Sequence, residues 1–136
     1  MIRPIIKDPI FLGGKSEPLT AADPQLARDL KDTLSAHSTE CVGMAANMIG
    51  VKKRAIVFDD DGRPGLMFNP EIEKKADPYE AEEGCLSLSG VRKTRRWRII
   101  TVVYRDEAFR PRTRVLVGRT AQIVQHEIDH CNGILI

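Results

Sequence analysis

The chain has 136 residues, of which 42% are hydrophobic and 29% are charged, and its formal net charge is +2. It contains no apolar run long enough to cross a bilayer, and its N-terminal segment is too short and too interrupted for a signal peptide, which argues against a membrane-embedded or secreted protein. Three cysteines are too few for a disulfide framework and fit a reducing compartment. We therefore expect a cytoplasmic protein in which residues 1–136 form one domain.

The first predicted element is a helix at residues 24–38. Asp23 is a residue type that favours the N-cap, and Pro24 suits the first helical position because its missing N–H has no partner there anyway. The leucines that follow recur at every fourth position, so they share one face of the helix.

The middle of the chain predicts strands. Residues 44–49 are expected to run extended, and two strands, Lys53–Phe58 and Leu66–Asn69, flank a turn signal at residues 60–62. Further strands, rich in β-branched residues or alternating in polarity, are predicted at residues 98–104 and 112–117. A helix from Gly118 to about Cys131 follows. The fold class expected is α+β, with antiparallel strands packed around this C-terminal helix.

The last predicted helix carries a His-Glu-x-x-His motif, formed by His126, Glu127 and His130. Histidines at positions i and i+4 lie on one helix face, so both imidazoles can bind the same metal ion. Glu127 projects about 100° around the helix from His126, which suits a general base for a metal-bound water. The motif therefore predicts a catalytic metal site rather than a purely structural one.

A catalytic site of this kind needs a third protein ligand. Only six residues follow His130, and none of them is a histidine, so we expect the ligand to come from upstream. The candidates are Cys85, Cys41, His37 and several carboxylates. We favour Cys85, because it lies between two glycines that allow close backbone approach and because thiolate suits zinc or ferrous iron better than carboxylate does.

Three motifs in chain order resemble those of the peptide deformylase family, which removes the formyl group from the N-terminal methionine of new polypeptides. The family's E-G-C-L-S and Q-H-E-x-D-H motifs are intact at residues 83–87 and 125–130. Its G-x-G-x-A-A-x-Q motif reads C-V-G-M-A-A-N-M at residues 41–48. The resemblance covers the chain from about residue 5 to residue 136.

The resemblance implies that Cys85, His126 and His130 hold one divalent ion, Fe²⁺ or Zn²⁺, with water in the fourth position. It further implies that Glu127 takes a proton from that water as the water attacks the formyl carbonyl, and that the backbone N–H of Leu86 binds the oxyanion. Contacts with the formyl-Met peptide substrate are expected from Val42, Gly43, Met44, Arg92 and Ile123.

The first motif departs from the family at its last position. Met48 replaces a glutamine whose side chain donates a hydrogen bond to the oxyanion, and methionine has no donor. Loss of one such donor typically costs about 2.7–4 kcal/mol of transition-state stabilisation. Neighbouring Asn47 is expected to point to the opposite face of an extended segment, so it is no substitute. We therefore expect a slower deformylase, and the alternative is a paralogue with weak or altered N-deacylase activity.

A different class of function is suggested by the charge distribution. Between Arg92 and Arg119 the chain has ten Lys or Arg residues but only two acids. One interpretation is a weak contact with the ribosome, or even a non-enzymatic RNA-binding module. The interpretation that we favour is that these residues form the solvated faces of two strands.

Overall fold

The computed structural model describes residues 1–136, and none of its helices has the length and apolar character that crossing a membrane requires. The chain forms three α-helices, one 3-10 helix and five strands. In chain order these are α1 (Pro9–Leu12), α2 (Pro24–Ala36), β1 (Gly43–Ala45), η1 (Ala46–Ile49), β2 (Ala55–Asp60), β3 (Arg63–Gly84), β4 (Val91–Arg105), β5 (Pro111–Val117) and α3 (Gly118–Cys131).

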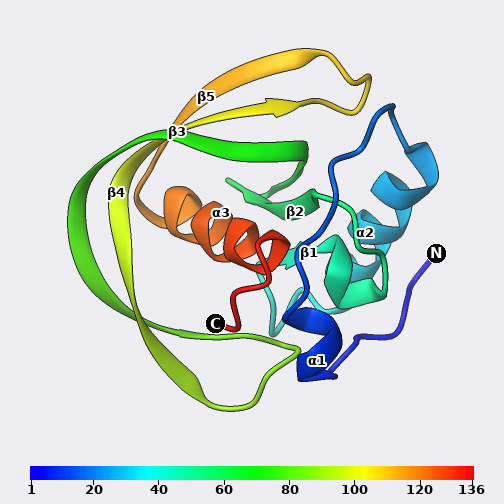
Figure 1. Ribbon diagram of the computed structural model, residues 1–136, viewed down its shortest axis with the longest axis horizontal. Coiled ribbons are helices and arrows are strands. Elements are labelled where there is room, and N and C mark those ends of the chain that lie inside the picture. Colours follow the sequence, from blue (N-terminus) through cyan, green and yellow to red (C-terminus); the bar gives the residue numbers. More distant parts are fainter.

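The five strands form one antiparallel sheet in the order β1-β2-β3-β4-β5, so each strand pairs with its neighbour in the chain. The long strands β3 and β4 curve around α3, whereas α1 and α2 lie on the other side of that helix (Figure 1). The register between β3 and β4 shifts twice near Phe68–Lys74, and such irregularities bend a sheet. The result is a helix enclosed by a curved sheet, and the predicted α+β class is confirmed.

The main hydrophobic core lies where α2, α3 and the first strands of the sheet meet. Its largest fully buried side chains include Phe58 and Phe68 from adjacent strands and Leu30 from α2. Full burial of a side chain of this size contributes about 1.5–3 kcal/mol. This core fixes the inner face of α3, which carries the motif histidines.

The helices of the sequence prediction are found close to their predicted limits. The Asp23 side chain accepts a hydrogen bond from the Leu26 N–H at 3.0 Å and caps α2, which ends at Ala36, two residues before the predicted end. The last helix has the predicted limits, and the hairpin turn between β2 and β3 lies at Asp61 and Gly62, as predicted.

One expectation about the strands was wrong, and one predicted strand is much longer than expected. Residues 44–49 do not run extended throughout, because β1 ends at Ala45 and the chain then turns into η1. The strand predicted at residues 66–69 is part of β3, which continues to Gly84. Much of this extension is polar and exposed on both faces of a two-stranded ribbon, so it carries no apolar alternation in the sequence.

Candidate metal centre and active site

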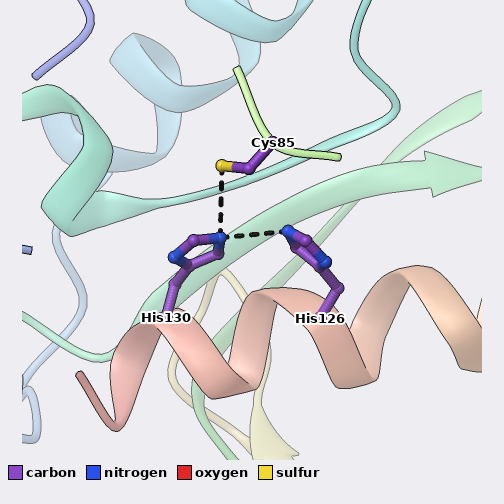
Figure 2. A group of neighbouring side chains, drawn as sticks. All are labelled: Cys85, His126 and His130. Carbon is purple, nitrogen blue, oxygen red and sulfur yellow. Dashed lines mark hydrogen bonds between the residues drawn. The ribbon is translucent and has the colours of Figure 1, made fainter. Parts of the chain in front are cut away.

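Three metal-binding groups converge at the inner face of α3. His126 and His130 project from this face toward the thiol of Cys85, which lies just after the end of β3 (Figure 2). The Nε2 atoms of the two imidazoles are 3.0 Å apart, and the Cys85 Sγ is 3.3 Å from the His130 Nε2. All three donor atoms lie within 4.8 Å of one another. One thiol and two imidazole nitrogens form a donor set that suits zinc or ferrous iron.

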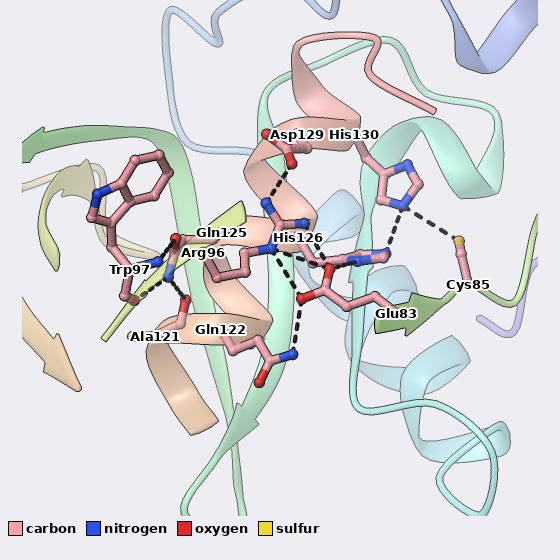
Figure 3. A network of polar contacts seen from close by, with 10 residues as sticks. All are labelled: Glu83, Cys85, Arg96, Trp97, Ala121, Gln122, Gln125, His126, Asp129 and His130. Atoms are coloured by element: carbon pink, nitrogen blue, oxygen red, sulfur yellow. Dashed lines mark hydrogen bonds and ion pairs between the residues drawn. The ribbon is translucent and has the colours of Figure 1, made fainter. Parts of the chain in front are cut away.

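The outer nitrogen of His126 is held by a buried carboxylate. Glu83 lies 2.8 Å from the His126 Nδ1 and forms an ion pair with Arg96, whose Nη2 is 2.7 Å from the same carboxylate (Figure 3). Burial raises the pKa of Glu83, but the hydrogen bonds from His126, Arg96 and Gln122 outweigh it and lower the pKa to about 2. Glu83 is therefore an anion that accepts a hydrogen bond from the His126 Nδ1–H, so Nε2 is the nitrogen of this ring that a metal ion would bind.

The two histidines are shifted in opposite directions in the metal-free protein. Burial lowers the pKa of His126, but hydrogen bonds with Cys85 and Glu83 raise it to about 10. Burial and the neighbouring charge of His126 lower the pKa of His130 to about 3. The two rings therefore differ in charge near neutral pH, and their Nε2 atoms face each other at 3.0 Å, where one divalent ion could bind both.

Glu127 lies beside this cluster and is almost fully buried. Its Oε1 has no hydrogen-bond partner in the chain, and burial raises its pKa to about 7 despite the opposing effect of His126. A carboxylate with a pKa near neutrality can accept and return a proton at physiological pH. The position of Glu127 therefore suits a general base.

Strand β1 approaches α3 closely at Gly43. A Cβ atom at this position would lie 2.8 Å from the Glu127 Oε2 and 2.8 Å from the Ile123 Cγ2. Real Cβ atoms are not found at such distances, so the glycine lets the strand pass directly over the catalytic face of the helix. On its outer side β1 has no partner strand, and this free edge borders the site.

A cavity of about 600 Å³ opens beside the cluster, between β1, the segment after β3 and the first turns of α3. Most of the residues predicted for the site line it. These are Val42, Gly43, Met48, Cys85, Leu86, Ile123, His126 and Glu127. The predicted residues that do not line it are Met44, Arg92 and His130.

The structure does not support side-chain contacts from two of these residues. Met44 is completely buried in the core, because alternate side chains of β1 point away from the cavity. Arg92 lies outside the cavity on β4, and its guanidinium donates to the Ser89 carbonyl at 3.3 Å. Met44 can therefore contribute only its backbone to the site. Arg92 is connected to the site only through the nearby Gly90, which lines the cavity.

The first-motif departure lies at the cavity wall. Met48 is buried in η1, and its sulfur accepts a hydrogen bond from the Ala45 N–H at 3.4 Å. The side chain of Asn47 does not replace the missing donor, as expected, although the expected reason was that it lies in an extended segment. It lies in a 3-10 helix rather than a strand, and its amide donates to the His130 carbonyl at 3.0 Å. The backbone N–H of Leu86 makes no hydrogen bond within the chain and remains available at the cavity.

The remaining cysteines and His37 are not part of the donor cluster. Cys131 is buried in the core, whereas Cys41 lines the cavity with its Sγ 2.8 Å from the Gly43 carbonyl oxygen. His37 lies at the C-cap of α2, and its Nδ1 is 2.8 Å from the Glu40 Oε1. Of the three upstream candidates for the third ligand, only Cys85 reaches both histidines.

Sequence reasoning missed the polar surroundings of the cluster. Arg96 binds Glu83 and also Asp129, whose carboxylate is 2.7 Å from its Nη1. Gln122 donates to Glu83 at 2.9 Å, and Arg119 joins it in lining the cavity. Gln122 lies four residues before His126, so both lie on one helix face. This spacing was the signal in the sequence that could have indicated Gln122 as a site residue.

The basic stretch of β4 is largely neutralised by its partner strand. The register places Glu80 opposite Arg95 and Glu82 opposite Lys93. Further along the chain, Arg112 pairs with Asp106 at 3.0 Å. Opposite charges that face each other across a ribbon do not form the continuous basic surface that nucleic-acid binding requires. The charge pattern therefore favours the interpretation that these basic residues form solvated strand faces.

Comparison with known proteins extends the resemblance to deformylases from the three motifs to the whole chain. A family model described as polypeptide deformylase matches residues 2–136. The peptide deformylase of Clostridium beijerinckii is 54% identical over 136 residues, which cover 100% of both chains. The crystal structure of PDF from the Vibrio parahaemolyticus bacteriophage VP16T, in complex with actinonin, has a TM-score of 0.88 and 32% identity, and the match covers 98% of this chain and 99% of that one.

A second solved structure is the class I type b peptide deformylase from Acinetobacter baumannii bound to Met-Ala-Ser. It has a TM-score of 0.89 and 29% identity, and the match covers 99% of this chain and 97% of that chain. The resemblance seen in three short motifs is therefore confirmed along the full length of the fold. With its antiparallel sheet, its His-Glu-x-x-His helix and its upstream thiol, the chain belongs to the polypeptide deformylase family.

Proposed function

We propose that the protein hydrolyses the formyl amide of formyl-methionyl peptides and releases formate. The observation that carries this proposal is the convergence of Cys85, His126 and His130 within 4.8 Å, with a buried carboxylate beside them at the end of a peptide-sized cavity. The relative from Acinetobacter baumannii binds the tripeptide Met-Ala-Ser, which corresponds to a deformylated product. Family membership and site chemistry thus support the same reaction.

The three donors would hold one divalent ion. When bound, such an ion acidifies a water molecule and polarises the carbonyl that the water attacks. The buried Glu83 keeps the Nδ1 of His126 protonated, so the ring presents its other nitrogen. The native metal is proposed to be Fe²⁺ or Zn²⁺, because both accept a mixed sulfur and nitrogen donor set.

Glu127 would handle the protons of the reaction. It takes a proton from the attacking water and returns it to the amine that leaves when the carbon–nitrogen bond breaks. Its unpartnered Oε1 and its pKa of about 7 support both steps. The Leu86 N–H would donate to the carbonyl oxygen as negative charge develops there. Met48 adds no donor at this point, so the chain is expected to be slower than a member that carries glutamine.

The substrate would bind as an extended peptide along the free edge of β1. Pairing with the backbone of Val42–Met44 would fix the direction of the peptide chain and bring its formyl group to the metal-binding cluster. The methionine side chain would then occupy the cavity beside Ile123. This arrangement needs a close approach of strand and helix, which Gly43 permits.

We further propose that residues 1–136 act as one catalytic domain in the cytoplasm, where formylated nascent chains are made and where the Cys85 thiol stays reduced. Ribosome contact through the basic strands would be weak, because acidic residues of β3 face them in register. No observation favours the RNA-binding or altered N-deacylase alternatives over deformylation.

The proposal is tested with protein purified anaerobically and loaded with Fe²⁺ or Zn²⁺. Formate release is measured on formyl-Met-Ala-Ser, with acetyl-Met-Ala-Ser as the matched acyl control. We expect metal-dependent release from the formyl peptide and little from the acetyl peptide. Absence of formate release from a fully loaded protein would refute the proposal, and preference for the acetyl peptide would support an altered N-deacylase instead.

A further inference from the structure

Gln122 lies between the substrate cavity and the polar network that surrounds the metal-binding cluster. It is one helical turn before His126 on α3, and its side chain lines the cavity. Its Nε2 donates a hydrogen bond to the Glu83 Oε2 at 2.9 Å, whereas its Oε1 makes no hydrogen bond within the chain (Figure 3). The intact deformylase motifs contain Glu83 and His126 but not Gln122.

The hydrogen bonds of Glu83 show what Gln122 contributes. One carboxylate oxygen, Oε1, is 2.8 Å from the His126 Nδ1 and 2.7 Å from the Arg96 Nη2. The other oxygen, Oε2, has only two donors, the Arg96 Nε at 3.0 Å and the Gln122 Nε2 at 2.9 Å. Because the Arg96 Nε is shared with Oε1 at 3.2 Å, Gln122 supplies the only undivided hydrogen bond to Oε2.

A carboxylate held at both oxygens is fixed in rotation as well as in position. Without Gln122, Oε2 would keep only the Arg96 Nε that it shares with Oε1, so the carboxylate would be held less firmly and the angle of its hydrogen bond to the His126 ring could change. A metal-binding histidine depends on such a partner for its ring orientation. The wall of the cavity would then also admit water to a buried ion pair.

We propose that Gln122 is a positioning residue, which fixes Glu83 and through it the metal-binding orientation of His126 from within the wall of the substrate cavity. The inference rests on the proposed function for its link to the substrate. A substrate side chain in the cavity would pack against Gln122, whose amide also binds Glu83. Substrate binding would therefore affect the geometry of the metal site through the Gln122 side chain. This coupling predicts an effect on metal retention that an ordinary cavity-wall residue does not have.

The test replaces Gln122 with methionine, which has the same length and no donor. Zn²⁺-loaded Gln122→Met and wild-type proteins are mixed with an excess of a chromophoric chelator, and the rate of Zn²⁺ transfer is followed. We expect Gln122→Met to lose Zn²⁺ faster by about 3–10-fold, less than for loss of a direct partner of a metal ligand. In steady-state assays of formate release, kcat should fall more than KM rises.

The matched control is Ile123→Val, which alters the neighbouring cavity wall without touching Glu83. This variant should change KM for formyl-Met peptides and keep the wild-type rate of Zn²⁺ loss. Thermal unfolding of the loaded proteins checks that each variant folds. If Gln122→Met does not fold, Gln122→Asn takes its place, since its shorter amide cannot reach Glu83.

A readout that requires no turnover is the nitrogen NMR spectrum of the Zn²⁺-loaded protein. The His126 Nδ1–H signal should shift in Gln122→Met and not in Ile123→Val. Wild-type Zn²⁺ retention and an unchanged His126 signal in Gln122→Met would overturn the inference. This outcome would leave the proposed function intact as long as the wild-type protein releases formate.

Discussion

Glu83 accepts a hydrogen bond from the Nδ1 of His126 at 2.8 Å, and both side chains are almost fully buried. This contact joins two intact motifs that are 43 residues apart in the chain. It keeps a proton on Nδ1, so that Nε2 is the nitrogen of the ring that a metal ion would bind. The metal site therefore depends on a residue that is not itself a ligand.

Replacement of Glu127 tests its place in the reaction separately from metal binding. Glu127→Gln keeps the size of the side chain but cannot take up a proton, so we expect formate release to fall by about 10²–10⁴-fold. Metal content should stay at the wild-type level, because Glu127 is not one of the three donors. Elemental analysis and a formate assay on the same preparation measure both. Near-normal turnover in Glu127→Gln would exclude it as the general base.

Met48→Gln tests the missing hydrogen-bond donor. Glutamine matches methionine in length, and at this point of the cavity wall its amide can donate to the developing oxyanion. We expect kcat for formyl-Met peptides to rise by up to about 10², which is the lower end of the effect of one such donor. Met48→Leu, which changes the side chain without adding a donor, should give no gain. Equal rates for the two variants would mean that the oxyanion lies elsewhere.

Metal binding to the metal-free protein should release protons. The pKa of His126 is raised to about 10 in this state, so the ring is charged at neutral pH and must lose a proton to become a ligand. Each bound ion should therefore displace about one proton from His126 near neutral pH. Affinity should therefore rise as the pH rises toward 10. Calorimetric titration with Zn²⁺ in buffers of different ionisation enthalpy counts these protons, and a count of zero would contradict the assigned protonation state.

Acid should destabilise the metal-free protein through Glu83. Its pKa is lowered from 4.5 to about 2 on folding, so its contribution to stability is fully present above about pH 4.5 and is lost as the pH falls toward 2. Urea unfolding at a series of pH values should show this loss, and Glu83→Gln should show a weaker dependence over the same range. An identical pH dependence in both proteins would show that Glu83 is not responsible.

The buried ion pair should be costly to break. Arg96 contacts Glu83 and Asp129, each at 2.7 Å, and its side chain is 4% exposed. Arg96→Met removes the cation and leaves Glu83 as a poorly compensated buried charge, which typically costs about 3–5 kcal/mol of unfolding free energy. Arg98→Met is the matched control, because Arg98 pairs with Asp77 at the surface and should cost less than about 1 kcal/mol. Similar losses in both variants would contradict the importance of burial.

The sequence predicted the three donor groups that the structure brings together, and the signal for the two histidines is local. The spacing of His126 and His130 places them on one helix face, and the glycines around Cys85 favour it among the candidates for the upstream ligand. The N-cap at Asp23 and the glycine that begins α3 set helix limits that hold in the structure. Each of these features depends on a few neighbouring residues.

The features that were missed depend on pairing across the fold. The register of β3 with β4 decides that Arg96 turns inward onto Glu83 while Arg95 faces Glu80, and no local pattern distinguishes the two arginines. The turn into η1 after Ala45 packs against α1, α2 and α3, which are distant in the sequence, so no local pattern shows these contacts. Met44 is expected in the wall along which the peptide binds, and its side chain is buried because that face of the strand packs into the core, which the sequence does not show.

X-ray absorption spectroscopy of the metal-loaded protein tests the central claim most directly. Zn²⁺-loaded wild-type protein should show one sulfur ligand at about 2.3 Å and two imidazole nitrogens at about 2.0–2.1 Å, and Cys85→Ser should lose the sulfur shell. A spectrum without sulfur, or a sulfur shell that persists in Cys85→Ser, would contradict the site described for Cys85, His126 and His130.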